Sequence, residues 1–245
     1  LGAMAGGWRS GRPRGAMARA RHRRGSPASA PDISRPDLPV EEKWNVYTHF
    51  FGFLLSLIGS GWVFFHLDLE GFRVAFGVFL YGLSLVALFG ASTIYHAVYR
   101  EYQAFWQKVD HIAIYFLIAG SYTPVGLTVL YNSSGVYLLI AVWGLALVGL
   151  LYKLFFIHHW PRFSLFLYLA MGWLVVFEFN SVQESFSEAA MNNLIIGGIL
   201  YTTGVLFYRW HQWQWHHVVW HLFVLGGAFF HYLMVVEILS QMNYL

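Results

Sequence analysis

The sequence predicts an all-α membrane protein, a bundle of seven transmembrane helices, from its composition and its apolar stretches. Of its 245 residues, 58% are hydrophobic and only 11% are charged, against roughly 25% charged residues in a soluble domain. Seven stretches of about 20 apolar residues alternate with charged or turn-forming segments, as transmembrane helices require. The chain has no cysteine, which excludes a disulfide framework and a thiolate metal site.

Residues 1–40 form a basic tail that precedes the first apolar stretch. Eight arginines and five prolines fall in this segment, a composition that predicts disorder. The chain opens on Leu1 rather than methionine, so we expect part of the tail to come from an added segment or a misplaced start. Residues 41–245 are expected to form the seven-helix transmembrane domain.

Charged or turn-forming residues bound each apolar stretch and so set the order of the expected helices. These helices span residues 46–66, 74–98, 110–131, 135–157, 163–180, 190–208 and 217–239. Between them lie, in order, Asp68, Glu70 and Arg73; Arg100 and Lys108; the turn NSSG at 132–135; the loop HHWPRF at 158–163; Glu184 and Glu188; and Arg209. Because the connections are short, consecutive helices are expected to run in alternate directions.

The distribution of basic residues between the loops predicts the orientation of the bundle. With the tail in the cytoplasm, all basic loop residues except Arg73 fall on the cytoplasmic side: Lys43, Arg100, Lys108, Lys153, Arg162 and Arg209. The acidic residues Asp68, Glu70, Glu184 and Glu188 fall on the opposite side. This pattern satisfies the positive-inside rule and predicts a cytoplasmic N-terminus and an external C-terminus.

Polar residues converge at the cytoplasmic ends of the second, third and seventh expected helices. Ser92 and His96 lie four residues apart, Asp110 lies one turn inside the third helix, and His217 and His221 share one face of the seventh. Three imidazoles are typical of an open zinc site, in which Asp110 would fill the fourth position directly or through a water. Zinc suits these ligands better than calcium or magnesium, whereas iron, manganese and nickel stay open. The histidine pair alone is equally compatible with an interhelical hydrogen bond.

Other polar residues of the expected helices receive different interpretations. His231 lies ten residues, or about 15 Å, beyond His221, so we expect it to hydrogen-bond within the bundle rather than to share the ion. His111 points about 100° away from Asp110 and is expected to pack or to support the site. Asn45 and His49 either orient the ligands or cap the first helix, and we favour the cap.

Four segments of the chain resemble the hemolysin III family, the largely bacterial branch of the progestin and adipoQ receptor superfamily. They are EEKWNVYTH (41–49), STIYH (92–96), DHIAIYFLIAGSYTP (110–124) and HHVVWHLFVLGGAFFH (216–231). The resemblance implies seven helices in a bacterial inner membrane with a zinc ion near the inner leaflet. It further implies that His96, His217 and His221 bind zinc, that Asp110 holds the zinc-bound water and that Ser92 hydrogen-bonds within the site.

Three functions are compatible with these residues. The first is a zinc-dependent hydrolase that cleaves an amide of a ceramide-like membrane lipid, with Asp110 orienting or deprotonating water and Ser92 hydrogen-bonding a developing oxyanion. The second is a receptor-like sensor or regulator of membrane state with structural zinc. The third, a pore-forming cytolysin, is disfavoured because the polar residues crowd at one end of the helices. In each case membrane lipid is the expected partner, as substrate or ligand, and nucleic acid is not.

Overall fold

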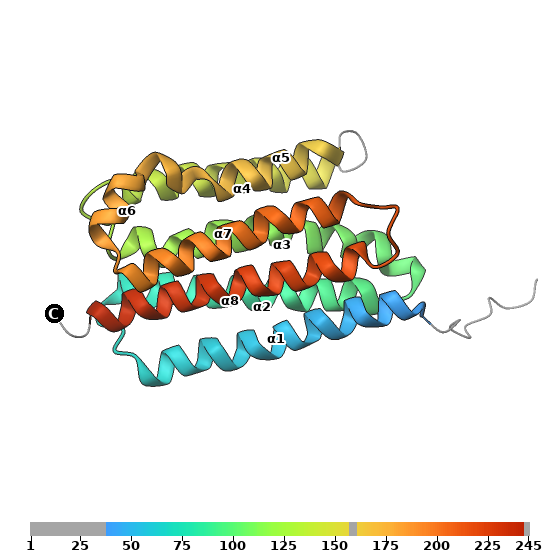
Figure 1. The fold of residues 1–245 in the computed structure, drawn as a ribbon, viewed down its shortest axis with the longest axis horizontal. Helices are drawn as coiled ribbons and strands as arrows, with labels where there is room; N and C mark the ends of the chain where they lie inside the picture. Colours follow the sequence, from blue (N-terminus) through green and yellow to red (C-terminus); the bar gives the residue numbers. More distant parts are fainter. Residues whose placement is uncertain (1–37, 157–160, 243–245) are drawn as a thin grey trace, which may run out of the picture. The chain divides into compact units, whose positions relative to one another are not determined.

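The computed structural model describes residues 38–156 and 161–242, and within these ranges all regular structure is helical. The helices are α1 (Val40–His66), α2 (Phe72–Ala97), α3 (Arg100–Leu127), α4 (Gly135–Phe156), α5 (Pro161–Gly172), the 3₁₀ helix η1 (Leu174–Glu178), α6 (Phe179–Ser185), α7 (Glu188–Arg209) and α8 (His216–Met242) (Figure 1). The predicted all-α fold is therefore confirmed for the described residues. Most of the predicted basic tail, and the loop residues His158 and His159, lie outside them.

Within residues 38–156 and 161–242, six helical segments are long and apolar enough to cross a membrane. They are α1, α2, α4, the combined segment Arg162–Ser185, α7 and α8. Helix α3 has 28 residues but is more polar, with Lys108, Asp110 and His111 in its first half. The six apolar helices make the chain a multi-pass integral membrane protein.

Large apolar side chains project outward from these helices. On α1 alone, Ile58 is 68% exposed and Phe65 is 87% exposed. Soluble monomers rarely present contiguous apolar surfaces of this extent, because water makes them costly. In a bilayer the same surface faces lipid hydrocarbon, which is equally apolar. The exposed side chains of α1 are therefore suited to contact lipid.

The order of helix packing brings four helix termini together. Helix α1 packs against α2 and α8, α8 also packs against α7, and α3 packs against α2 and α4 (Figure 1). The first turns of α1, α3 and α8 and the last turn of α2 lie at the same end of these helices. We call this the histidine end, because α2 and α8 present His96, His217 and His221 there.

The fifth predicted helix, residues 163–180, is not continuous. It is divided into α5, η1 and α6, and the break follows Gly172. The hydroxyl of Tyr122 on α3 lies there, 3.0 Å from the Met171 carbonyl oxygen and 2.8 Å from that of Gly172, and it accepts a 3.1 Å hydrogen bond from the Val175 amide. A side chain that enters the hydrogen-bond ladder of a helix in this way interrupts it. The predicted fifth helix is therefore present as the apolar segment Arg162–Ser185, which is long enough to cross a membrane, but it is interrupted.

Candidate metal centre

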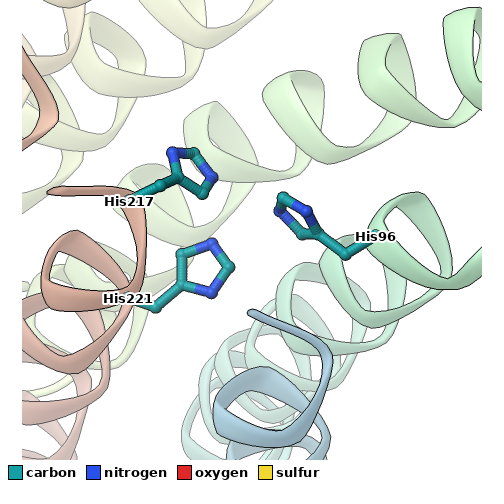
Figure 2. Close-up of side chains that lie close together, drawn as sticks. All are labelled: His96, His217 and His221. Carbon is teal, nitrogen blue, oxygen red and sulfur yellow. The ribbon is translucent and has the colours of Figure 1, made fainter. Parts of the chain in front are cut away.

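Three histidines from two helices converge at the histidine end. His96 lies in the last turn of α2, and His217 and His221 lie on successive turns of α8, with their rings facing one another (Figure 2). One ring nitrogen from each lies within 4.8 Å of the other two. His96 and His221 are 4% and 2% exposed, so the cluster is withdrawn from bulk solvent. Within the described residues the predicted three histidines therefore come together in an arrangement that could hold a metal ion.

The hydrogen bonding of His96 supports this interpretation. Its Nδ1 lies 2.7 Å from Oε2 of Glu42, whereas its Nε2 is buried and has no hydrogen-bond partner in the part of the chain that the structure describes. A buried polar atom without a partner is costly, so such an atom calls for an explanation. A metal ion shared with His217 and His221 would give His96 Nε2 the partner it lacks, and imidazole nitrogens are ligands that zinc accepts.

The structure also brings the two predicted catalytic residues to this end of the bundle. Ser92, one turn before His96 on α2, is 1% exposed, and Asp110 on α3 is 8% exposed. The two side chains hydrogen-bond to each other, and Asp110 interacts electrostatically with His96. Asp110 is not one of the three residues whose ligand atoms cluster within 4.8 Å, so its place is beside the histidines.

A buried lysine adds a positive charge that the sequence interpretation had only counted among the basic residues on the cytoplasmic side. Lys153 on α4 is only 5% exposed, and its Nζ lies 3.2 Å from Nδ1 of His111. It also interacts electrostatically with Asp110. His111 thus supports the site from α3, in line with one of its two expected roles. A buried lysine is rarely left unpaired, so Asp110 and Lys153 partly compensate each other's charge.

The first three turns of α1 contribute residues that the sequence interpretation did not assign to the site. Glu42 contacts His96, and Oγ1 of Thr48 lies 3.3 Å from Nδ1 of His221. Glu42, Asn45 and His49 are spaced by three and four residues, which places them on one helix face. That spacing, together with the position of the segment at the histidine end, is the signal that could have identified Glu42.

The favoured role of Asn45 and His49 as helix caps is wrong. The N-cap residue of α1 is Pro39, and no side chain caps it. Asn45 and His49 are instead buried, at 2% and 3% exposure. The ring of His49 stacks on that of His221, with centroids 3.5 Å apart and planes 11° apart. The alternative role, orienting the ligands, is the one that this geometry supports.

His231 lies on α8 away from the cluster, as its separation along the helix predicts. It hydrogen-bonds the backbone of Leu194 on α7, and its ring packs against Gly197, where no side chain intervenes. It is therefore a histidine that joins two helices.

An apolar cavity begins about one turn beyond the centre. It has a volume of about 250 Å³ and lies among α3, α5, η1, α7 and α8. Ile114, one turn after Asp110, and Trp220, next to His221, line it near the histidines. Phe186 and Met234 line it toward the other end of the helices. The cavity thus offers an elongated apolar volume whose one end lies close to the polar site.

Comparison with known proteins places these residues in a wider context. The family description "Haemolysin-III related" matches residues 39–232, which include every site residue described above. The chain is 38% identical over 201 residues to the Hemolysin-3 homolog of Bacillus subtilis (strain 168), with 77% of this chain and 89% of that protein covered. It is 35% identical over 190 residues to Hemolysin-3 of Bacillus cereus, with 77% and 87% covered. A more distant match, 25% identical over 226 residues, is the Adiponectin receptor protein of Drosophila melanogaster, covering 78% of this chain and 49% of that protein.

Proposed function

The chain belongs to the haemolysin III-related family of membrane proteins, and we propose that it is a zinc-dependent hydrolase of a membrane lipid amide. The observation that carries the proposal is the position of the three histidines and Asp110 within about one helical turn of residues that line an apolar cavity. Hydrolysis of a lipid needs a polar reaction centre beside a space for apolar chains. The described part of this chain offers both within one bundle.

We propose that α3 is the seventh span and that the N-terminus is cytoplasmic. A helix of 28 residues is about 42 Å long, enough to cross a bilayer. Although α3 is more polar than the other helices, its neighbours shield it from lipid. It packs between α2 and α4, and Tyr115 and Ala119 are fully buried. The positive-inside pattern of the loops supports a cytoplasmic position for the histidine end. The relatives from Bacillus make the inner membrane of a bacterium the proposed location.

His96, His217 and His221 are the proposed zinc ligands. Three nitrogen ligands and an open fourth position are the arrangement of catalytic zinc sites. The ion, when bound, supplies Lewis acidity, which polarises a carbonyl oxygen and makes water a nucleophile near neutral pH. The protein contributes the fixed ligand positions and a site withdrawn from bulk solvent.

Asp110 is the proposed general base and acid. Its carboxylate accepts a proton from the attacking water as the water oxygen bonds to the amide carbon. When the carbon–nitrogen bond breaks, the same proton passes to the departing amine, so that a free carboxylic acid and an amine result. Ser92 hydrogen-bonds Asp110 and holds its carboxyl group in place. That contact makes orientation of Asp110, rather than contact with the oxyanion, the role of Ser92 that the geometry supports.

The apolar cavity is the proposed site for an acyl chain of a ceramide-like substrate. Its lining near the centre, Ile114 and Trp220, would contact the first methylenes beyond the amide. Each methylene that leaves water gains about 0.8 kcal/mol, but for a lipid already in a bilayer the gain is smaller. The cavity therefore serves mainly to place the amide at the histidine end rather than to provide affinity.

The test is the turnover of a ceramide by purified, zinc-loaded protein in lipid vesicles. Wild-type protein is expected to release fatty acid and sphingoid base, and Asp110→Asn is expected to lower the rate by about 10²–10⁴-fold, as loss of a general base does. The zinc content of Asp110→Asn should equal that of the wild type. If zinc-loaded wild-type protein cleaves no lipid amide, the hydrolase proposal fails and the sensor with structural zinc takes its place. Ion conductance by the same vesicles would instead favour the pore.

A further inference from the structure

Helix α1 contacts two of the three candidate zinc ligands without offering a ligand to the cluster. Oε2 of Glu42 lies 2.7 Å from Nδ1 of His96, and Oγ1 of Thr48 lies 3.3 Å from Nδ1 of His221. In both histidines it is thus Nδ1 that faces α1. The nitrogen left for a metal ion is Nε2 in each case.

The contact with Glu42 specifies which nitrogen of His96 carries the proton. An ionised carboxylate can only accept hydrogen bonds, so at 2.7 Å the Nδ1 atom of His96 must be the donor. Neutral imidazole then has its lone pair on Nε2, the buried atom that lacks a partner among the described residues. The side-chain amide of Asn45 lies 3.4 Å from the same Glu42 oxygen and steadies it.

The contact with Thr48 specifies the proton of His221 by a different argument. A hydroxyl has one hydrogen, and Thr48 Oγ1 lies 2.8 Å from the carbonyl oxygen of Trp44 and 3.1 Å from that of Asn45. With its hydrogen directed to the helix backbone, this oxygen faces His221 as an acceptor. His221 therefore donates from Nδ1 and also has its lone pair on Nε2, while the stacked ring of His49 fixes the plane of its imidazole.

We propose that Glu42 and Thr48 are positioning residues that hold His96 and His221 in the tautomer that binds zinc through Nε2. The first three turns of α1 thereby set the affinity for zinc without touching the ion. Partners of this kind orient the ligand ring and raise its basicity, and their loss typically weakens metal binding about 10–100-fold. The inference rests on the proposed zinc site but is independent of whether the site hydrolyses a lipid.

The experiment is a zinc titration of the detergent-purified full chain against a chelator of known affinity. Glu42→Ala is expected to weaken zinc binding about 10–100-fold. Glu42→Gln should lie between wild type and Glu42→Ala, because an amide oxygen still accepts from Nδ1 but without the charge. Thr48→Val removes the hydroxyl that accepts from His221 at nearly constant shape and should weaken zinc binding. Thr48→Ser keeps the hydroxyl and should bind zinc with the affinity of the wild type.

A neighbouring acidic residue provides the matched control. Glu41 lies in the same first turn of α1, but its carboxylate accepts a 3.1 Å hydrogen bond from Gln214 rather than from a histidine. Glu41→Ala should therefore keep the wild-type zinc affinity. Cobalt substitution adds a readout of geometry, since the visible absorption bands of bound Co²⁺ should shift in Glu42→Ala and Thr48→Val but not in Glu41→Ala.

The possible results separate this inference from the hydrolase proposal. Wild-type affinity and cobalt spectrum in Glu42→Ala would overturn the inference, and so would an equal loss in Glu41→Ala. If Glu42→Ala does not fold, the comparison of Thr48→Val with Thr48→Ser decides the question. A wild-type chain that binds no zinc removes the site and the positioning role together. Zinc binding that depends on Glu42, without any lipid turnover, leaves the inference standing and refutes only the hydrolase.

Discussion

The histidine end and the apolar cavity are built from the same helices but have opposite characters. At the histidine end, α3 and α8 present Asp110, His217 and His221: Asp110 hydrogen-bonds Ser92 of α2, the centroids of the two histidine rings lie 4.7 Å apart, and His221 contacts Thr48 of α1. One turn further along, the same two helices line the cavity with residues such as Ile114 and Val224. The change from polar to apolar therefore occurs within a single turn of each helix.

The difference follows from the cost of polar groups in hydrocarbon. A polar side chain at membrane depth needs partners, and those partners are most easily gathered where several helix ends meet close to water. The apolar cavity needs no such network and can occupy the depth of the bundle. The histidine end would therefore perform the chemistry, and the apolar cavity would accommodate an acyl chain. Three experiments test how sharply the two regions are separated.

The largest effect is expected from removing two of the three candidate ligands. The double variant His217→Ala, His221→Ala leaves His96 as the remaining member of the cluster, and one imidazole cannot hold zinc tightly. Metal analysis by mass spectrometry of detergent-purified protein should find one zinc per chain in the wild type and none in the variant.

His231→Ala is the control for this measurement. It removes a histidine from the same helix, but from the part that packs on Gly197 rather than from the histidine end. Zinc content should be unchanged in this variant. Loss of zinc from His231→Ala, or its retention in the double variant, would mean that the two regions are not separate in metal binding.

The convergence of the three histidines could be predicted from sequence because it depends on helix periodicity and direction. Residues four positions apart on a helix share one face, as His217 and His221 do. The alternation of helix direction then predicts that His96 lies at the same end of the bundle. The spacing of Glu42 marks its helix face, but its contact with His96, like that of Thr48 with His221, depends on how closely α1 approaches α2 and α8, and this distance has no periodic signal. The inward position of the Lys153 side chain is equally difficult to predict, because a lysine near a helix end is usually expected to reach toward water rather than toward Asp110.

The second prediction concerns the cavity and is expected to have an intermediate effect. Gly198 on α7 lines the cavity, and a Cβ added there would meet no atom within 4 Å. Gly198→Phe should therefore place a ring in space that a lipid chain would use. Each excluded methylene costs at most about 0.8 kcal/mol, and less for a lipid taken from a bilayer, so the loss of two should lower kcat/KM for long-chain substrates by up to about tenfold.

A glycine outside the cavity provides the comparison. Gly144 on α4 also has room for a Cβ, but it is exposed and does not line the cavity. Gly144→Phe should leave turnover of every chain length unchanged, and both variants should keep their zinc. Equal loss of activity toward short and long chains in Gly198→Phe would show that the cavity does not hold the acyl chain.

The break in the fifth predicted helix could not be read from the sequence. Residues 163–180 contain no proline, and their apolar content is that of an ordinary span. The interruption depends on a hydroxyl from another helix, Tyr122, that reaches the backbone near Gly172. A contact between residues 50 positions apart is a property of the packed bundle, so local sequence can neither predict it nor exclude it.

The smallest effect is expected from Tyr122→Phe, which removes this hydroxyl while keeping the ring. The Val175 amide loses its acceptor and the Met171 and Gly172 carbonyls lose a neighbouring donor, which should cost about 1–3 kcal/mol of stability. The midpoint temperature of thermal unfolding in detergent should fall by a few degrees. Tyr137→Phe changes a ring that is 76% exposed and should leave this temperature unchanged. Zinc affinity should stay at the wild-type value, because Tyr122 lies twelve residues beyond Asp110, about 18 Å along α3. A weaker affinity in Tyr122→Phe would instead show that the helix break is coupled to the histidine end, and the two regions would then have to be treated as one site.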